Sequence, residues 1–280
     1  MRPKLSIIIP MKGKISLITQ LLLSIYYHCG YDRNRMDIIL ADTGSSDVEK
    51  KLVKFFIGRL KRENNMNCKM VEYDYYNFSK INNDVVNHHI SDDTELILFM
   101  NNDMMLINDA ISMAVDTYER NKEDVGTVGI RLMYADNTVQ HAGIDIVYYT
   151  KFTESVGATH YLIRKPFIVK DRGEVTTCGN TGAFMLVSRK DFISVGGFNE
   201  EYEGCFEDVE FNMQMLLKGR RNITNIDAIC FHYESATRGR VVNKTDVKRL
   251  QTFILEKPSL KKVVEDIRKR EPVNKWIRFK

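Results

Sequence analysis

Hydrophobic residues in the first hundred positions form two kinds of segment that alternate along the chain. Four short aliphatic runs are typical of buried strands, and they occupy residues 5–10, 36–42, 68–74 and 95–100. Three intervening segments have apolar residues at helical spacing, and they are residues 15–29, 48–61 and 79–90. Strands that are apolar along their whole length and alternate with helices predict a mainly parallel sheet with helices on both faces.

The second half of the chain has a weaker pattern. Strands are expected at residues 125–134 and 222–232, a polar turn at residues 136–143, and no clear period is present in residues 145–175. A helix is expected from residue 207 to a stop at Gly219, with an apolar stripe of Val209, Met213, Leu216 and Leu217.

Polar residues follow several of the predicted strands directly. The run from Leu96 to Met100 passes into Asn101-Asn102-Asp103, and Pro10 and Asp42 end two other strands. Because ligands in open α/β sheets bind beyond the carboxyl ends of the strands, we expect these residues to lie near one site.

Asp103 and His232 are the candidate metal ligands. Carboxylate oxygen is a ligand of Mg²⁺ and Mn²⁺, and an imidazole beside a carboxylate fits the same ions, with a diphosphate and water in the remaining positions. The alternatives are a plain turn residue at Asp103 and a structural histidine at the end of a strand.

Three acids have two interpretations each. Glu207 and Asp208 open a helix, where acids cap free N–H groups, but either is also suited to act as a general base toward a hydroxyl. Asp42 is either a turn residue or an acceptor of hydrogen bonds from a base or ribose. Because GxGxxG, Walker A and HExxH are absent, a dinucleotide dehydrogenase, a P-loop enzyme and an HExxH protease are not supported.

Taken in order, these motifs closely resemble family 2 glycosyltransferases of the GT-A fold, a Rossmann-like α/β fold with a mixed, mainly parallel central sheet. The stretches that match span residues 5 to about 240, and they are LSIIIPMKGK, IILADTGSSD, NFSKINND, LILFMNNDM, VQHAG, TGAFMLVSRKDFISVGGFNEEY, EDVEFNMQMLLKG and FHYESATRG. The match is to the bacterial branch that builds surface polysaccharides, with rhamnosyl- and galactosyltransferase-like members.

The resemblance implies roles position by position. The donor-binding residues would be Pro10 and Asp42 around the base, Lys80 near the nucleotide or diphosphate, Asn101, Asn102 and Asp103 as the DxD element, Thr181, Gly182 and Ala183 beside the donor sugar, and Arg238 near phosphate. Asp208 would be the catalytic base with Glu207 beside it, Asp103 and His232 would bind the metal, and His141 and Tyr233 would line the site or the acceptor.

The activity implied is inverting, Mn²⁺- or Mg²⁺-dependent transfer of one sugar from a UDP- or dTDP-linked donor to a hydroxyl of a glycan or lipid-linked acceptor in surface-polysaccharide synthesis. Asn101 replaces the first carboxylate of the DxD element, and PMKGK departs from the usual residues after the first strand. The QxxRW element of processive synthases is absent, since the single tryptophan is Trp276. A sugar nucleotidyltransferase and a non-catalytic nucleotide- or carbohydrate-binding module are the alternatives.

The end of the chain differs in charge from the rest. Residues 257–280 have nine Lys/Arg against three Asp/Glu, a net of +6, whereas the whole chain has +4. We therefore divide the chain into a transferase domain, residues 1–240, and a basic helical tail, residues 241–280. Leu260, Val263, Val264 and Ile267 share one face of the tail, which predicts either a helix packed on the domain or a membrane-surface segment.

Composition places further limits on location and partners. Five cysteines without CxxC spacing are typical of reduced thiols in a cytoplasmic protein, and no apolar run is long enough for a membrane span. We expect a cytoplasmic protein with at most a peripheral attachment to the inner membrane face. No nucleic-acid-binding motif accompanies the positive charge, so nucleic acid is not an expected partner.

Overall fold

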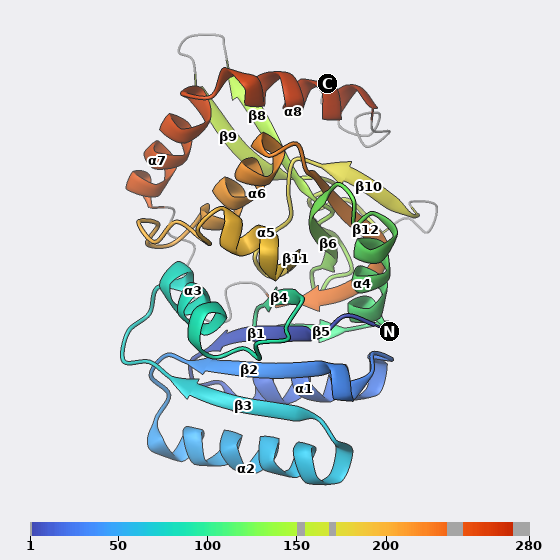
Figure 1. The fold of residues 1–280 in the computed structure, drawn as a ribbon, viewed down its shortest axis with the longest axis vertical. Helices are drawn as coiled ribbons and strands as arrows, with labels where there is room; N and C mark the ends of the chain where they lie inside the picture. The colour runs from blue at the N-terminus through green and yellow to red at the C-terminus, as the bar shows by residue number, and fades with distance from the viewer. Residues whose placement is uncertain (1, 150–154, 168–171, 234–242, 271–280) are drawn as a thin grey trace.

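The computed structural model describes residues 2–149, 155–167, 172–233 and 243–270 (Figure 1). The elements predicted in the first hundred residues are confirmed. The strands are β1 (Leu5–Met11), β2 (Met36–Asp42), β3 (Asn67–Glu72) and β4 (Leu96–Met100), and the helices are α1 (Ile15–His28), α2 (Asp47–Asn64) and α3 (Phe78–His88), with a short 3₁₀ turn η1 (Arg33–Arg35).

Eight strands and five helices follow in the described part of the chain. The strands are β5 (Met104–Leu106), β6 (Val125–Met133), β7 (Val139–His141), β8 (Ile144–Tyr149), β9 (Ser155–His160), β10 (Glu174–Thr177), β11 (Phe184–Ser188) and β12 (Arg221–His232). The helices are α4 (Ala110–Arg120), α5 (Arg189–Ser194), α6 (Glu207–Leu217), α7 (Lys244–Leu255) and α8 (Pro258–Arg270).

The central sheet has the order β10-β12-β6-β11-β4-β1-β2-β3, with β5 paired to β12 and β7 to β6. The strands β4, β1, β2 and β3 are parallel, β11 is antiparallel to both of its neighbours, and β12 is parallel to β6. The sheet is therefore mixed and mainly parallel, as predicted. Because β11 is antiparallel to β4, the first residue of β11, Phe184, pairs with the last residue of β4, Met100. The residues just before β11 therefore lie next to those that follow β4.

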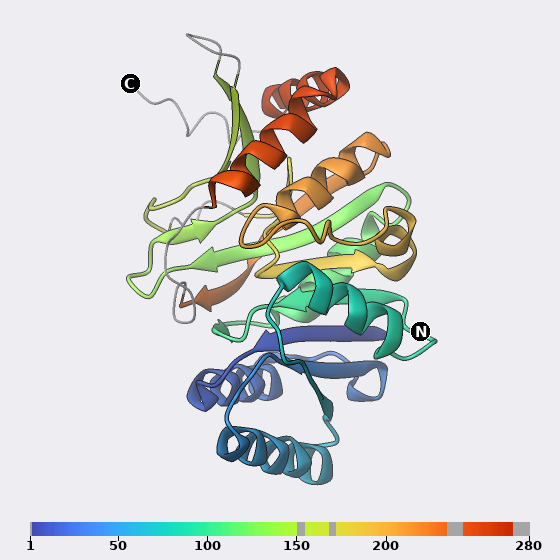
Figure 2. The same cartoon turned by 90° about the vertical axis from the view of Figure 1, so that its left-hand side faces the viewer.

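Helices cover both faces of the sheet. Successive side chains of a strand point to opposite faces, so a strand that is apolar along its length packs on both sides. On β1, Leu5, Ile7 and Ile9 pack in a cluster with α1, α2 and α4, whereas Ile8 packs in a second cluster with α3, α5 and α6. A third cluster joins α6, α7 and α8 to the hairpin β8–β9, so that α2 and α8 lie at opposite ends of the molecule (Figures 1 and 2).

Two expectations for the second half are wrong, and one part without a prediction gains structure. Residues 139–141 form the buried strand β7 and not part of a polar turn, which is limited to the residues before it. The part around residues 145–175, for which no element was predicted, includes most of the hairpin β8–β9 and the start of β10. Leu217 is 40% exposed and does not belong to the buried stripe of α6. The buried residues of α6 pack in two clusters, Phe211 and Met215 in one and Val209, Met213 and Leu216 in the other.

The apolar face of the tail is covered by the protein. Leu260, Val264 and Ile267 of α8 are buried against α6 and α7, and Val263 is half-buried in the same cluster. The interpretation of a helix packed on the domain is therefore confirmed for α8, and these residues are not free to enter a membrane. Trp276 lies outside the described residues. No helix in the described ranges is both long and apolar enough to cross a bilayer.

Candidate functional site

Asp103 and His232, which are far apart in the sequence, meet at the edge where β5 pairs with β12. The antiparallel register sets His232 opposite Met104, and Tyr233 N donates a 2.9 Å hydrogen bond to Asp103 O. Asp103 Oδ1 lies 3.2 Å from His232 Nε2, and both side chains are nearly buried. The predicted pair of metal ligands is thus side by side.

Gln140 of β7 orients the imidazole of His232. Its Oε1 lies 2.7 Å from His232 Nδ1, and an amide oxygen can only accept, so Nδ1 is the protonated nitrogen. Nε2 then accepts from Asn101 Nδ2 at 3.2 Å and faces Asp103. A metal-binding histidine is commonly held in this way, by a hydrogen bond from its other nitrogen.

The pair Asp103 and His232 fits a divalent cation. Asp103 Oδ1 is buried and makes no hydrogen bond, although it lies 3.2 Å from His232 Nε2. The only other polar group at Nε2 in the described residues is the amide of Asn101, so a carboxylate oxygen and an imidazole nitrogen face one point. In the described ranges no cluster of three His, Cys, Asp or Glu side chains is suited to a metal. Two protein ligands are consistent with a cation that takes its other ligands from a diphosphate and water.

Asp208 is linked to the same edge of the sheet through the segment before β11. Its Oδ2 accepts a 2.8 Å hydrogen bond from Gly182 N, and Ala183 O accepts one of 3.0 Å from Asn101 N. Gly182 and Ala183 therefore join the first residue of the DxD element to the predicted base. A Cβ on Gly182 would lie 3.2 Å from Phe78 Cζ, so this approach also brings the start of α3 to the site.

Buried amides hold α6 against this segment. Asn212, one turn after Asp208, donates from Nδ2 to Asn180 O at 2.8 Å and to Asp208 O at 2.7 Å, and its Oδ1 accepts from Asn180 N and Thr127 Oγ1. Asn212, Asn180 and Thr127 are fully buried. Because unpaired buried amides are costly, this network favours one position of Asp208 relative to Gly182.

Glu207 and Asp208 are adjacent but lie in different environments. Burial, with a smaller contribution from the nearby Asp208, raises the pKa of Glu207 to about 8. Asp208 is half-exposed and accepts hydrogen bonds from Gly182 N and Val209 N. Near pH 7 Glu207 therefore holds a proton, whereas both oxygens of the Asp208 carboxyl group face backbone N–H donors.

The predicted nucleotide side lies at the ends of β1 and β2. Asp42 is fully buried, accepts a hydrogen bond from Ser45 Oγ and lies 3.8 Å from Lys50 Nζ. Gly13 N in turn donates to Ser45 Oγ at 2.7 Å, so Asp42 organises the turns after both strands. Pro10 is half-buried and Lys80 is exposed on α3.

The remaining predicted residues differ in how far they are exposed at the site. Thr181 is half-exposed beside Gly182, and Tyr233, also half-exposed, has its hydroxyl 3.2 Å from Gln20 Nε2. Asn102 is buried, with no partner for its Nδ2. His141 is 1% exposed and packs edge-on against His160 at 4.7 Å, so it lies beneath the site surface; burial holds its pKa well below the usual value. Arg238 lies outside the described residues.

Gln140 is a site residue that sequence reasoning missed. It is part of the VQHAG stretch, in which only His141 was singled out. No local signal identified it, because the sequence predicted a turn here and its partner His232 lies 92 positions away.

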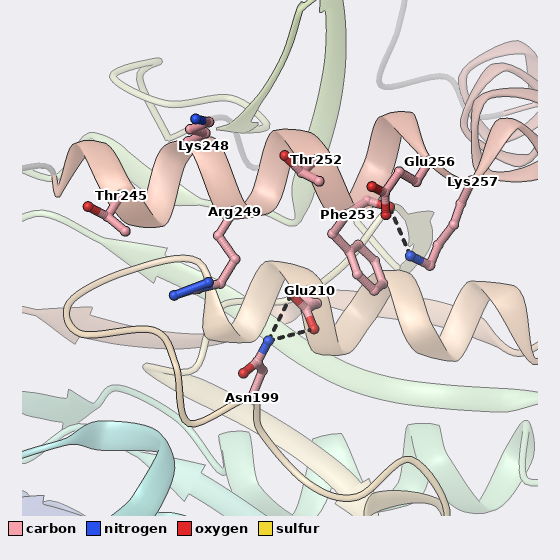
Figure 3. A pocket seen from close by; sticks show the side chains of 9 residues that line it. All are labelled: Asn199, Glu210, Thr245, Lys248, Arg249, Thr252, Phe253, Glu256 and Lys257. Carbon is pink, nitrogen blue, oxygen red and sulfur yellow. Dashed lines mark hydrogen bonds between the residues drawn. The ribbon is translucent and has the colours of Figure 1, made fainter.

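A groove of about 370 Å³ lies away from these residues, between α6 and α7 (Figure 3). Asn199 and Glu210 line one side, and the other is lined by α7, including Arg249 and Phe253, and by Lys257 just after it. None of the predicted site residues lines the groove, so it is not the candidate active site.

Comparison with known proteins gives distant relatives. The chain is 28% identical over 242 residues to the O-antigen biosynthesis protein RfbC of Myxococcus xanthus and 27% identical to the uncharacterized protein y4gI of Sinorhizobium fredii. These matches cover 84% and 85% of this chain but only 18% and 25% of the relatives, so the chain spans a quarter or less of their length. No family model matches the chain.

Solved structures define the fold class. S. aureus TarS 1–349 in complex with UDP-GlcNAc has a TM-score of 0.61 at 15% identity, over 96% of this chain and 67% of that one. The mannosyltransferase PcManGT from Pyrobaculum calidifontis, in complex with GDP-Man and Mn²⁺, has a TM-score of 0.59 at 15% identity, over 85% and 59%. The fold is therefore that of the GT-A glycosyltransferases, as predicted from the sequence.

Proposed function

We propose that the protein is a metal-dependent glycosyltransferase that moves one sugar from a nucleotide-diphosphate donor to a hydroxyl of a glycan or lipid-linked acceptor. The observation that carries this proposal is the meeting of Asp103 and His232, with an unpartnered carboxylate oxygen between them. Asn101 and Gly182 connect this pair to Asp208 through two hydrogen bonds. The two proposed metal ligands, the segment 181–183 and the proposed base are thus neighbours in the structure.

Each residue has a distinct task in the proposed reaction. Asp103 and His232 hold Mn²⁺ or Mg²⁺, which when bound would neutralise charge on the diphosphate leaving group. Asp208 accepts the proton of the acceptor hydroxyl as that oxygen attacks the anomeric carbon. One displacement of this kind inverts the anomeric centre. Gly182 N donates a hydrogen bond to Asp208 Oδ2. This bond fixes the orientation of the carboxylate before the acceptor binds.

The donor side is assigned to the ends of the parallel strands. We propose that Pro10 and Lys80 contact the nucleotide, that the buried Asp42 holds the turns beside it through Ser45, and that Asn102 and Thr181 contact the diphosphate or sugar. The solved neighbours support a nucleotide-sugar donor, because TarS is in complex with UDP-GlcNAc and PcManGT is in complex with GDP-Man and Mn²⁺. The name of the M. xanthus relative supports a role in surface-polysaccharide synthesis, which we propose for this chain.

All of the proposed site residues that the structure describes lie within residues 1–240, the range predicted for the transferase domain. Membership of family 2, single rather than processive addition, and a cytoplasmic or peripheral location remain predictions from the sequence.

The base assignment is tested by Asp208→Asn. We expect transfer to fall on the order of 10²–10⁴-fold, because loss of a general base costs that much, while donor binding is retained. The measurement is release of nucleoside diphosphate from a panel of UDP-, dTDP- and GDP-sugars with Mn²⁺, together with donor affinity by calorimetry. Asp93→Asn, which alters an exposed acid at the opposite end of β4 from Asp103, is the matched control.

Three results would contradict the proposal. Full turnover in Asp208→Asn would assign the base to another group. Release of pyrophosphate instead of nucleoside diphosphate would identify a nucleotidyltransferase. Donor binding without any turnover in the wild type would identify a binding module.

A further inference from the structure

The first helix of the predicted tail, α7, contacts the segment that leads into the catalytic pair. Asp246 of α7 is fully buried and accepts three backbone hydrogen bonds from consecutive residues. Its Oδ1 accepts from Glu203 N at 3.2 Å, and its Oδ2 accepts from Gly204 N at 2.9 Å and Cys205 N at 3.2 Å. Glu207 and Asp208 follow within three residues of this contact.

Two further contacts connect α7 to the same part of the chain. Asn243, the N-cap of α7, donates from Nδ2 to Glu203 Oε2 at 3.1 Å. Arg249, one turn after Asp246, forms a 2.9 Å ion pair with Glu201. Figure 3 shows Arg249 pointing from α7 toward α6. Asp246 is the only buried member of these contacts, and it makes the largest number of bonds to the segment.

The start of α6 needs outside support. Phe206, its N-cap, has φ 76 and ψ 1, a left-handed conformation that is unfavourable for an aromatic residue, and no side chain caps the helix. Such conformations persist when the surrounding structure holds them. Asp246 fixes the three residues immediately before Phe206, and the amide network of Asn212 fixes α6 one turn later.

We infer that Asp246 is a positioning residue, which by binding the amides of residues 203–205 sets the start of α6 and so the place of Asp208 relative to the acceptor. This inference rests on the proposed function, in which Asp208 is the base. It assigns α7 to the catalytic unit, although α7 belongs to the segment that the sequence separated as a tail.

The chemistry of the contact requires a carboxylate. An ionised Asp only accepts hydrogen bonds, so both of its oxygens can face N–H donors. An Asn of the same shape has one oxygen and one NH₂ group, so at least one backbone donor would face another donor. Asp246→Asn therefore loosens the segment with almost no change of volume.

The test compares Asp246→Asn with Asp266→Asn, the same substitution at a half-exposed position of α8. We expect kcat for sugar transfer to fall roughly 10- to 100-fold in Asp246→Asn, since small misplacement of a reacting group has effects of this size. The KM for the donor and the Mn²⁺ dependence should stay at wild-type values. Amide hydrogen exchange of residues 203–208 should be faster in Asp246→Asn and unchanged in Asp266→Asn.

A second variant covers the case in which Asp246→Asn does not fold. Asn243→Asp keeps a good N-cap but places a carboxylate against Glu203, and it should lower kcat in the same direction by a smaller factor. Wild-type kcat and exchange in both variants would overturn the inference, as would an equal loss of donor binding. A wild-type protein without transfer would overturn the proposed function, and the exchange of residues 203–208 would then decide separately whether Asp246 holds this segment.

Discussion

At the scale of single residues, neighbouring acids are distinguished by their surroundings and not by their sequence. Glu207 is buried, and its pKa rises to about 8, whereas Asp208 is half-exposed and bound by two backbone N–H groups. The sequence favoured Asp208 as the base only through its resemblance to a family. The structure supplies a physical reason to separate the two roles.

The raised pKa of Glu207 makes stability depend on pH. Between about pH 4.5 and pH 8 the folded protein keeps a proton that the unfolded chain has lost, so this group's contribution to stability falls as pH rises through that window. Glu207→Gln cannot ionise, so its free energy of unfolding relative to the wild type should increase from pH 5 to pH 9 by a few kcal/mol, since each unit of pKa shift corresponds to about 1.4 kcal/mol.

Urea unfolding at the two pH values measures this difference, with Glu265→Gln, an exposed acid of α8, as the control. A difference between Glu207→Gln and the wild type that stays constant with pH would show that Glu207 ionises equally in both states.

Asp103 and His232 were singled out in the sequence because they end predicted strands and match motifs of a known family, and the structure places them 3.2 Å apart. Gln140 and Asp246 were not singled out, because an amide or an acid has no local pattern that reports a partner elsewhere in the chain. Gln140 contacts a residue 92 positions away, and Asp246 contacts residues 41 to 43 positions away. Their roles depend on tertiary contacts alone.

At the scale of elements, apolar strands were predicted well and the hairpin β8–β9 was not. Asp145 interrupts the alternation of β8 at a buried position, where it is paired with Arg268 of α8 at 2.7 and 2.9 Å. The charge that hides the strand in the sequence is thus compensated 123 residues later. A pattern read within a short window cannot include such a partner, whereas β1 and β4 contain no charged residue and need none.

The packing of α8 leads to a prediction about its role. Leu260 is fully buried, so Leu260→Ala should lower the free energy of unfolding by about 2–5 kcal/mol through lost contacts and a cavity. Leu217→Ala, the same substitution at a position 40% exposed, should have little effect. Urea unfolding gives both values.

Flotation with anionic liposomes separates this role from membrane binding. Leu260→Ala should leave flotation unchanged, because the side chain faces α6 and α7 and not the solvent. Normal stability together with lost flotation would mean that α8 leaves the protein to enter a membrane.

At the scale of the whole molecule, the site lies where two differently built parts of the sheet adjoin. The parallel strands β4, β1, β2 and β3 present the proposed nucleotide side, and β11, β6 and β12 hold the residues around the base and His232. The pairing of β5 with β12 joins them, since it brings Asp103 from one part to His232 from the other. A ligand bound at this junction should therefore stabilise the entire fold.

The corresponding prediction concerns thermal stability with UDP and Mn²⁺. A ligand that binds only the folded state at 100 times its Kd adds about 2.7 kcal/mol, which should raise the Tm of the wild type by roughly 5–10 °C. UDP with EDTA should have a much smaller effect, and Asp103→Ala should lose the increment due to Mn²⁺ because Asp103 supplies one of the two protein ligands. Asp93 is an exposed acid just before the start of β4, whereas Asp103 follows its end, so Asp93→Ala should respond as the wild type does. If UDP raised Tm equally in all three proteins with and without Mn²⁺, the nucleotide would bind without a cation at Asp103, and the two parts of the sheet would not be joined by a metal.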